Sequence, residues 1–299
     1  MTKDVLKPGM DNPYYDHAPL AQRKLLAWPN GARTAVITLV HLEYWELTAG
    51  EDAYRDPRFV GEYGSFDPDY RTWTQRDYGA RVGLFRLLDV LDKHKLKLTA
   101  PTNSEALTRY PQAVAALRQR GAEFAGHGHS ANRMITSRMD DAAETQFIAA
   151  SLDAVRGATG AAPRGWVGQD YGESARTPAL LAAAGVDYVL DWPNDDQPYL
   201  LKTSPPLLSI PSQPEWDDVQ QLWLRRMSMQ RFEEMLVEAF TVLNGEGGRV
   251  FVLSLHPWLI GMAHRIRYLD SALTQILRQD GVWSATAADV AAHARKALA

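Results

Sequence analysis

Two histidines that stand two residues apart are the clearest candidates for chemistry in this sequence. His127 and His129 follow a short apolar run, Glu123–Gly126, and a glycine separates them. Imidazole nitrogens bind divalent metal ions and exchange protons near neutral pH. The stretch therefore predicts a site for a metal ion or an activated water, with a structural or surface histidine pair as the alternative.

Further titratable residues come directly after other apolar runs of strand length. His41 and Glu43 follow Thr34–Val40, and His256 follows Arg249–Leu255. In a barrel of parallel strands the catalytic residues lie at the C-terminal ends of the strands, so we expect these side chains on one rim with the histidine pair. Polar residues that follow the remaining predicted strands are Asn103, Gln169, Asp170, Asp191, Asn194, Asp195, Asp196, Glu215, Asp217 and Asp218.

The spacing of these residues suggests roles. Residues i and i+2 of a strand point to the same side, so His41 should share a side with Glu43, and His127 with His129. Glu43, His127 and His129 could together hold a divalent ion, with zinc as the expected metal, and the pKa of a zinc-bound water falls to ~7. His256, on a separate strand, could donate a proton to a leaving nitrogen; a packed turn is the alternative.

The alternation of strands and helices predicts the fold class. Short apolar strands, seven or eight in number, alternate with amphipathic helices, which is typical of an α/β protein with parallel strands and crossover helices. The even spacing favours a (β/α) barrel over an open doubly wound sheet. The predicted strands are 34–40, 96–101, 123–126, 165–167, 186–190, 207–210, 249–255 and 282–284. The predicted helices are 78–94, 104–120 with a break at Pro111, 177–184, 229–244, 264–279, one that begins at an Asp141-x-x-Glu144 capping box, and a terminal helix capped by Thr286-x-x-Asp289.

Composition limits the classes of function. The 299 residues include no cysteine, which excludes a disulfide scaffold, a thiolate zinc site and a cysteine nucleophile. A formal net charge of −4 argues against nucleic acid and against a membrane surface as partners. The first residues form no apolar signal segment, and no apolar run approaches ~18 residues. We therefore expect a cytoplasmic protein with a small-molecule substrate.

Aromatic and acidic residues suggest how a substrate would be held. Residues 44–77 carry many aromatic side chains without a clean period, which is typical of a lid, a binding loop or an interface. We expect Trp45 and Trp166 to flank a flat ring, with Asp170 and Asp196 as polar contacts; aromatic packing and a turn cap are the alternatives. Residues 1–33 are interpreted as an irregular N-terminal arm, which leaves 34–299 as a single barrel domain.

Five segments, in order and at sensible spacing, resemble the polysaccharide deacetylase superfamily, and within it the allantoinase-like and cyclic-imide-hydrolase-like branch. The segments are DYGARVGLFRLLDVL (77–91), GHGHS (126–130), PRGWVG (163–168) leading to GVDYVLDWPNDDQPY (185–199), SIPSQPEWDD (209–218) and LSLHPWLIGMAHRIRYLD (253–270). The resemblance covers roughly residues 12–292. It implies a distorted (β/α) barrel of about seven parallel strands and a hydrolase acting on carbon–nitrogen bonds other than peptide bonds.

The resemblance also implies residue roles. His41 and Glu43 stand where related deacetylases carry a base and a metal-binding aspartate. His127 matches the first histidine of the family's His-x-x-x-His motif, whereas Ala131 occupies the place of the second, so a metal is not required by this pattern. His256 corresponds to the late histidine that acts as general acid. Members of the branch tend to be oligomers, and we expect a homo-oligomer.

The sequence thus predicts hydrolysis of a small amide, a cyclic imide or a ureide. Glu43 or His41 would activate water, with or without a metal, and His256 would protonate the departing nitrogen. Two alternatives stay open: a metal-dependent N-deacetylase of an acetylated sugar or amine, and a catalytically inactive barrel that binds a small ligand.

Overall fold

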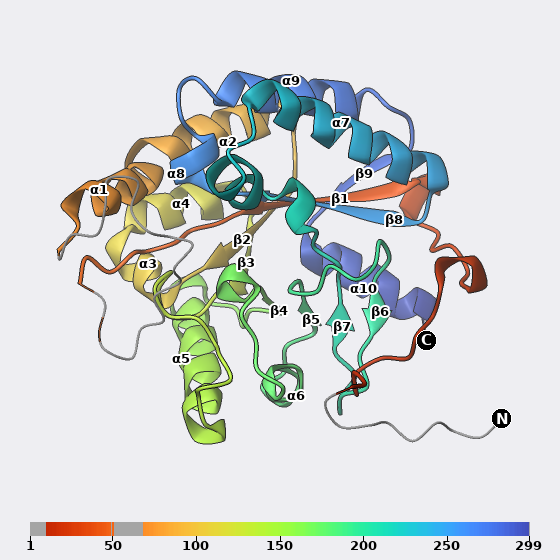
Figure 1. The fold of residues 1–299 in the computed structure, drawn as a ribbon, viewed down its shortest axis with the longest axis horizontal. Coiled ribbons are helices and arrows are strands. Elements are labelled where there is room, and N and C mark those ends of the chain that lie inside the picture. Colours follow the sequence, from red (N-terminus) through yellow and green to blue (C-terminus); the bar gives the residue numbers. More distant parts are fainter. Residues whose placement is uncertain (1–9, 49, 51–67, 299) are drawn as a thin grey trace.

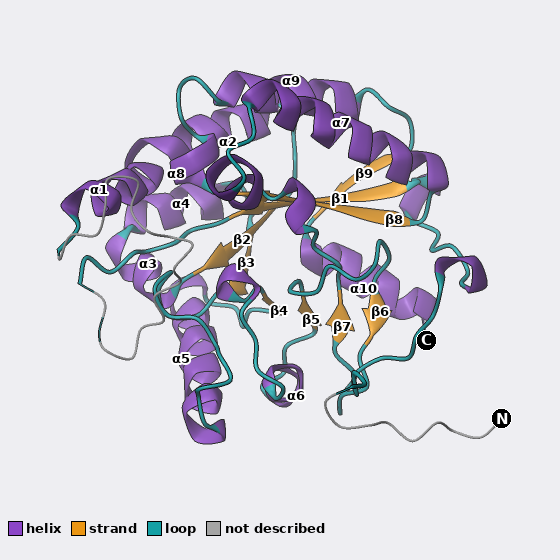
Figure 2. Cartoon of the chain, in the orientation of Figure 1, coloured by secondary structure: helices purple, strands orange, loops and turns teal. Residues whose placement is uncertain are grey.

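A single curled sheet forms the centre of the molecule in the computed structural model, which describes residues 10–48, 50 and 68–298. The strand order is β6-β7-β5-β4-β3-β2-β1-β8, with β9 beside the first half of β1. The strand pairs are parallel except for β6 with β7. Figure 2 shows the strands as a curved row with helices around it. The predicted distorted (β/α) barrel is confirmed, and it is a half-barrel because the row of paired strands begins at β6 and ends at β8.

The strands are β1 (Thr34–Val40), β2 (Leu98–Thr102), β3 (Glu123–Gly126), β4 (Gly165–Trp166), β5 (Tyr188–Val189), β6 (Tyr199–Leu200), β7 (Leu208–Ser209), β8 (Arg249–Leu255) and β9 (Val282–Ala285). The α-helices are α1 (Tyr70–Tyr78), α2 (Leu84–Lys93), α3 (Ser104–Arg109), α4 (Pro111–Gln119), α5 (Asp141–Thr159), α6 (Thr177–Ala183), α7 (Met229–Glu246), α8 (Pro257–Ile260), α9 (Ile266–Leu277) and α10 (Ala287–Leu298). Two π-helical segments, η4 (Gly79–Gly83) and η7 (Val219–Leu224), lie between them.

The long strands β1 and β8 separate two hydrophobic cores. Along β1, Val36 and Val40 pack with α2, α7 and α9, whereas Ile37 and Leu39 pack with α10. This alternation follows from the two-residue period of a strand. Figure 1 shows α7 and α9 over one face of β1 and β8, with α10 on the other side. Both faces are covered, which explains why these strands are continuous apolar runs.

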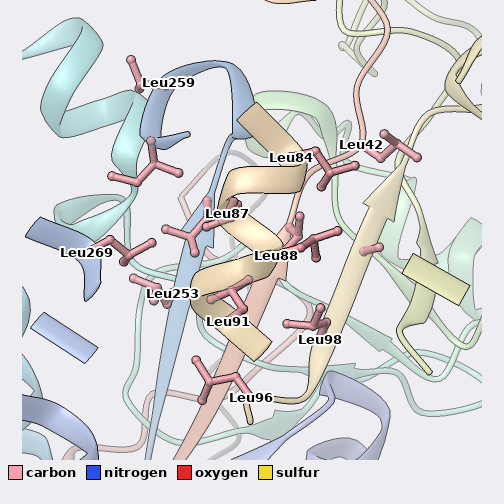
Figure 3. Packing of buried hydrophobic residues seen from close by; sticks show 14 of the residues in the cluster. Leu42, Leu84, Leu87, Leu88, Leu91, Leu96, Leu98, Leu253, Leu259 and Leu269 are labelled. Atoms are coloured by element: carbon pink, nitrogen blue, oxygen red, sulfur yellow. The ribbon is translucent and has the colours of Figure 1, made fainter. Parts of the chain in front are cut away.

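Helix α2 covers part of one face of the sheet. Leu84, Leu87, Leu88 and Leu91 recur at helical spacing and are buried. Figure 3 shows them against the strands, close to leucines of β2 and β8. Each fully buried leucine contributes about 1.5–3 kcal/mol, so this helix anchors the ends of the strands that carry the candidate site.

The helix predicted at 78–94 begins earlier and is interrupted. It starts at Tyr70, and η4 separates α1 from α2. The interruption lies where the chain packs directly on α8: a Cβ at Gly83 would be 2.0 Å from the Pro257 carbonyl oxygen, and one at Gly79 would be 2.8 Å from the Trp258 nitrogen. Only glycine permits this approach.

Other local predictions have mixed outcomes. The break at Pro111 is confirmed, and Thr286 and Asp289 form the reciprocal hydrogen bonds of a capping box. The Asp141-x-x-Glu144 box is wrong: Asp140 caps α5 by accepting from the Ala143 amide. The short antiparallel strand β6 carried no sequence signal.

The N-terminal arm lies on the barrel from residue 10 onward. Tyr14 and Tyr15 pack on the core around β4 and β5, and the buried Trp28 indole donates to the Arg249 carbonyl. Among the helices in the described part of the chain, none is long and apolar enough to cross a membrane.

Candidate active site at the C-terminal ends of the strands

His41 and Glu43 continue the inward-facing row of β1. The His41 amide donates to the Leu255 carbonyl and the Leu42 amide to the Pro101 carbonyl, at 3.0 and 2.9 Å, so the chain stays extended past the end of the strand. Leu42 is buried in the helix-facing core. Because side chains alternate, His41 and Glu43 point to the inner face.

His256 leaves β8 on the same inner face and is held by Asp218. The Asp218 carboxylate accepts from the His256 amide at 2.8 Å and from its Nδ1 at 2.6 Å. Burial opposes the charged imidazole, but the carboxylates of Asp218 and Glu43 raise the pKa of His256 to about 9. Burial in turn raises the pKa of Asp218 to about 6. Between these two values the pair is an imidazolium and a carboxylate, with Nε2 of His256 free to donate.

His127 is oriented by its backbone surroundings. Its Nδ1 donates to the Val167 carbonyl at 2.6 Å, and Asn103 Nδ2 donates to the His127 carbonyl at 2.5 Å. Its other ring nitrogen, Nε2, then faces Glu43 Oε1 at 3.5 Å and His41 Nδ1 at 3.4 Å. Because a carboxylate only accepts, Nε2 is placed to donate to Glu43 when it carries a proton, or to bind a metal ion when it does not.

Glu43 is the centre of the group. Its side chain is 5% exposed; Gln169 Nε2 donates to Oε1 at 2.7 Å, and His256 Nε2 lies 4.0 Å from the same oxygen. Burial alone would raise the pKa of Glu43, yet the imidazoles of His256, His127 and His41 hold that pKa well below its usual range. Glu43 is thus an anion in contact with three titratable rings.

His41 is the neutral member. Burial, together with the charges of His256 and His127, holds the pKa of His41 well below its usual range. Its ring stacks on His256 with centroids 4.0 Å apart and planes at 11°, and Ser254 Oγ lies 2.9 Å from its Nε2. The flat stacking of the two rings holds the His256 imidazole in place.

The second histidine of the predicted pair lies elsewhere. Gly128 has a φ of +73°, which breaks the extended alternation that the spacing argument assumed. The His129 side chain is 43% exposed, 4.0 Å from Glu105 Oε1 and 3.4 Å from Ser104 Oγ. The structure therefore brings His127 to Glu43 but directs His129 away from them.

The predicted substrate contacts separate into two groups. Trp45 lies near the site, with the guanidinium of Arg76 4.7 Å from its ring. Asp170 follows β4 in a left-handed conformation, φ 49°, and accepts from Gln220 at 3.3 Å. These two residues remain at the rim.

Trp166 and Asp196 are not brought to this group. Trp166 points away from the inner face and is buried in the core formed with α5 and α6. The Asp196 carbonyl accepts from the Val250 amide, six residues before His256 on β8. At ~3.3 Å per strand residue, this places the Asp196 backbone about 20 Å from His256 along the strand.

No role was predicted from the sequence for three residues that belong to the site. Asp218 and Gln169 appear only among the polar residues after strands, without their partners His256 and Glu43. Arg76 lies in the aromatic stretch, where no period indicated which side chains face inward. For Asp218 and Gln169, the position after a strand was the feature of the sequence that could have indicated a role. No such feature marked Arg76.

The donor set is compatible with a divalent metal ion. One ligand atom each from His41, Glu43 and His256 lie within 4.8 Å of one another, as do those of Asp217, Asp218 and His256, in the part of the chain that the structure describes. Nitrogen and carboxylate ligands of the first group suit zinc. Compared with the predicted set of Glu43, His127 and His129, Glu43 stays, and His41 and His256 take the places of the two predicted histidines.

Two comparisons with known proteins find similarity to polysaccharide deacetylases. Residues 70–189, from α1 to β5, match the family model described as polysaccharide deacetylase. A protein of Schizosaccharomyces pombe named "Putative polysaccharide deacetylase" is 28% identical over 300 residues, covering 88% of this chain and 91% of that protein.

Solved structures share the fold over nearly the whole chain. PuuE allantoinase is 23% identical with a TM-score of 0.82, covering 96% of this chain and 97% of that one. A "putative polysaccharide deacetylase from Mycobacterium smegmatis" is 24% identical with a TM-score of 0.78, covering 92% and 94%. At these identities the likeness concerns the fold.

Proposed function

We propose that this chain is a hydrolase of carbon–nitrogen bonds other than peptide bonds and that its substrate is a small cyclic imide, ureide or related amide; the match of residues 70–189 to the polysaccharide deacetylase model and the 28% identical Schizosaccharomyces pombe protein support the reaction class. The observation that carries the proposal is the pairing of a buried anion with a buried acid: Glu43 Oε1 and His256 Nε2 are 4.0 Å apart, and Asp218 holds the other nitrogen of the acid. General acid–base catalysis needs a base and an acid that both lie within hydrogen-bond reach of the reacting groups.

Glu43 would orient the attacking water and take one of its protons. The oxygen of the water then bonds to the carbonyl carbon, the carbon–nitrogen bond breaks, and Nε2 of His256 gives its proton to the departing nitrogen. The low pKa of Glu43 is caused in part by the positive charge of His256. As His256 gives up its proton this attraction disappears, so the carboxylate becomes a stronger base while the acid is spent. The proton on Glu43 then returns to His256 and restores the starting state.

The neighbouring residues keep this pair in position. Gln169 fixes Oε1 of Glu43, and the hydrogen bond of His127 Nδ1 to the Val167 carbonyl turns Nε2 of that ring toward the carboxylate. His41 stacks on His256 and stays neutral. These contacts orient the base and the acid before a substrate arrives, which reduces the cost of reorganisation during the reaction.

A metal-dependent N-deacetylase acting on an acetylated sugar or amine is the second candidate. The group formed by His41, Glu43 and His256 supports it, since these residues would hold the ion, zinc in our proposal. When bound, the ion would supply a water of lowered pKa. The two candidates differ in His256: as a ligand it must be neutral, whereas as the acid it carries the proton.

One experiment separates them. The purified protein is assayed on succinimide, hydantoin, allantoin and dihydrouracil, and on N-acetylglucosamine oligomers, before and after chelation, with metal content measured by elemental analysis. We expect turnover of at least one ring. Turnover confined to the oligomers, lost on chelation of stoichiometric zinc, overturns the first candidate; binding without turnover of either class would mean an inactive barrel.

The assembly is a separate proposal. We propose a cytoplasmic homo-oligomer, supported by the resemblance to an oligomeric branch. Light scattering coupled to size-exclusion chromatography measures the mass of the particle, and a mass equal to the 33.4 kDa chain would contradict it.

A further inference from the structure

Arg76 in α1 is a buried cation whose hydrogen-bond donors are not used. The residue is 5% exposed, and its Nε and Nη1 have no hydrogen-bond partner in the part of the chain that the structure describes. A buried guanidinium without a carboxylate or carbonyl partner is costly. Such a group is therefore expected to have a partner that binds from outside the chain.

Three tryptophan rings hold the guanidinium. Its central carbon lies 3.3 Å from the ring centroid of Trp258, 4.7 Å from that of Trp45 and 4.8 Å from that of Trp223. Rings stabilise the charge through its flat faces, whereas the N–H donors point outward in the plane of the group. The tryptophans thus support the charge without satisfying its donors. Burial lowers the pKa of Arg76 to about 9, which leaves it charged at neutral pH.

The tryptophans also place Arg76 beside the reacting groups. Trp45 comes two residues after Glu43, and Trp258 comes two residues after His256. The Glu43 carboxylate is close enough to raise the pKa of Arg76 against the effect of burial. The contact between Gly83 and the Pro257 carbonyl fixes α8, and with it Trp258, against the helix that follows Arg76.

We propose that Arg76 is a specificity residue that binds a carboxylate carried by the substrate next to the bond that is cleaved. The inference rests on the proposed hydrolase function and narrows its substrate class to acidic rings, such as an imide or ureide with a carboxylate side chain. A carboxylate accepts two parallel hydrogen bonds from a guanidinium, and in a buried site it also neutralises the charge. The charge and one of the two unused donors are then satisfied by the same ligand.

The test compares matched acidic and neutral ligands in wild type, Arg76→Met, Arg76→Lys and Arg81→Gln. Arg81 is a matched control because it follows on the same helical stretch but is 75% exposed and pairs with Asp77. Binding is measured by calorimetry with succinate and its neutral counterpart succinamide. Turnover is measured with hydantoin-5-acetate and hydantoin-5-acetamide.

We expect wild type and R81Q to prefer the acidic member of each pair by about 10- to 100-fold, and R76M to lose that preference. R76K keeps the positive charge but lacks the paired N–H donors of a guanidinium, so it should retain part of the preference for the acidic ligand. The melting temperature of R76M should not fall, because methionine packs well among aromatic rings and removes an unpaired buried charge. A lower melting temperature with an unchanged preference for succinate would mean a structural role and overturn the inference.

Failure of the wider proposal gives a different result. If no ring is hydrolysed but succinate still binds in an Arg76-dependent way, the anion site stands and the reaction assignment falls. If rings are hydrolysed and the preference for the acidic member is absent in wild type, or unchanged in R76M, the inference about Arg76 falls while the reaction stands.

Discussion

Two glutamates in this molecule have side chains that are almost completely hidden from solvent, at 0% exposure for Glu144 and 5% for Glu43, but their surroundings differ. Glu144, at 0% exposure, accepts from Ser174 Oγ at 2.7 and 3.0 Å, from Thr177 Oγ1 at 2.5 Å and from Arg176 Nη2 at 2.9 Å. Every one of these donors is a fixed partner, and together they fasten the start of α6 to α5. Glu144 is thus a structural anion whose oxygens are fully occupied.

Glu43 has one amide donor, Gln169, and otherwise faces imidazoles. The charge state of those rings changes with pH and during proton transfer, so the interactions of Glu43 can change within a catalytic cycle. The comparison teaches that burial of a carboxylate does not indicate function by itself. The indication comes from partners that can gain or lose a proton.

The largest expected effect is on activity at Glu43. Glu43→Gln keeps the shape and the Gln169 contact but removes the base, so kcat should fall by roughly 10²–10⁴-fold. The melting temperature should stay near that of wild type, since the amide fits the same space. Steady-state kinetics and thermal unfolding measure the two values. A variant that keeps wild-type kcat would show that Glu43 is structural like Glu144.

Glu144→Ala should give the opposite pattern. Removing the acceptor leaves Ser174 and Thr177 unpaired in the interior, and we expect the free energy of unfolding to fall by about 2–4 kcal/mol. The kcat of the folded enzyme should stay within about threefold of wild type. Urea titration measures the first value, and assays well below the unfolding midpoint measure the second. A large loss of kcat in the still-folded variant would contradict the distinction between the two glutamates.

His256, the proposed general acid, should set the alkaline limb of the pH–rate profile. His256 has a pKa raised from 6.5 to about 9, so it is protonated across neutral pH and activity should fall as pH rises through about 9. The same shift stabilises the fold fully below pH 6.5, and this contribution is lost as pH rises through about 9. Asp218→Asn removes the main charge that raises the pKa and should move the limb down by roughly 1–3 pH units.

Asp217→Asn is the matched control for that profile. Asp217 stands next to Asp218 but accepts from the Gln220 amide and Tyr171 instead of His256, and its charge is the smallest cause of the raised pKa. The alkaline limb of the pH–rate profile should move less in D217N than in D218N. Equal shifts in the two variants would mean that the hydrogen bond to Nδ1 does not set the protonation of His256.

Much of the site could be predicted because it continues regular structure. The strands 34–40 and 249–255 are long enough to fix which side chains point inward, so His41, Glu43 and His256 follow from a two-residue period. The barrel could be predicted because strands and helices alternate regularly along the chain. What lies beyond the reach of a regular strand was harder to predict.

Asp218 reaches His256 from a segment after the two-residue strand β7, and that approach is set by packing, not by a local pattern. Trp166 faces the wrong side because β4 is short and its neighbour Val167 takes the inner face. Arg76 belongs to a helix in which no apolar period could be recognised. In each case long-range contacts decide the orientation of the side chain.

The smallest expected effect concerns the residue that the sequence made most prominent. His129→Ala should change kcat/KM by less than about threefold, because the ring is half exposed beside Glu105 and its direction is set by the left-handed Gly128. His127→Ala is the matched comparison: it removes the ring nitrogen that faces Glu43 and should lower kcat/KM by at least about tenfold. Equal losses in the two variants, together with loss of bound metal, would restore the original ligand set of Glu43, His127 and His129. A loss confined to His127→Ala would mean that one glycine at +73° separates a functional histidine from an ordinary surface one.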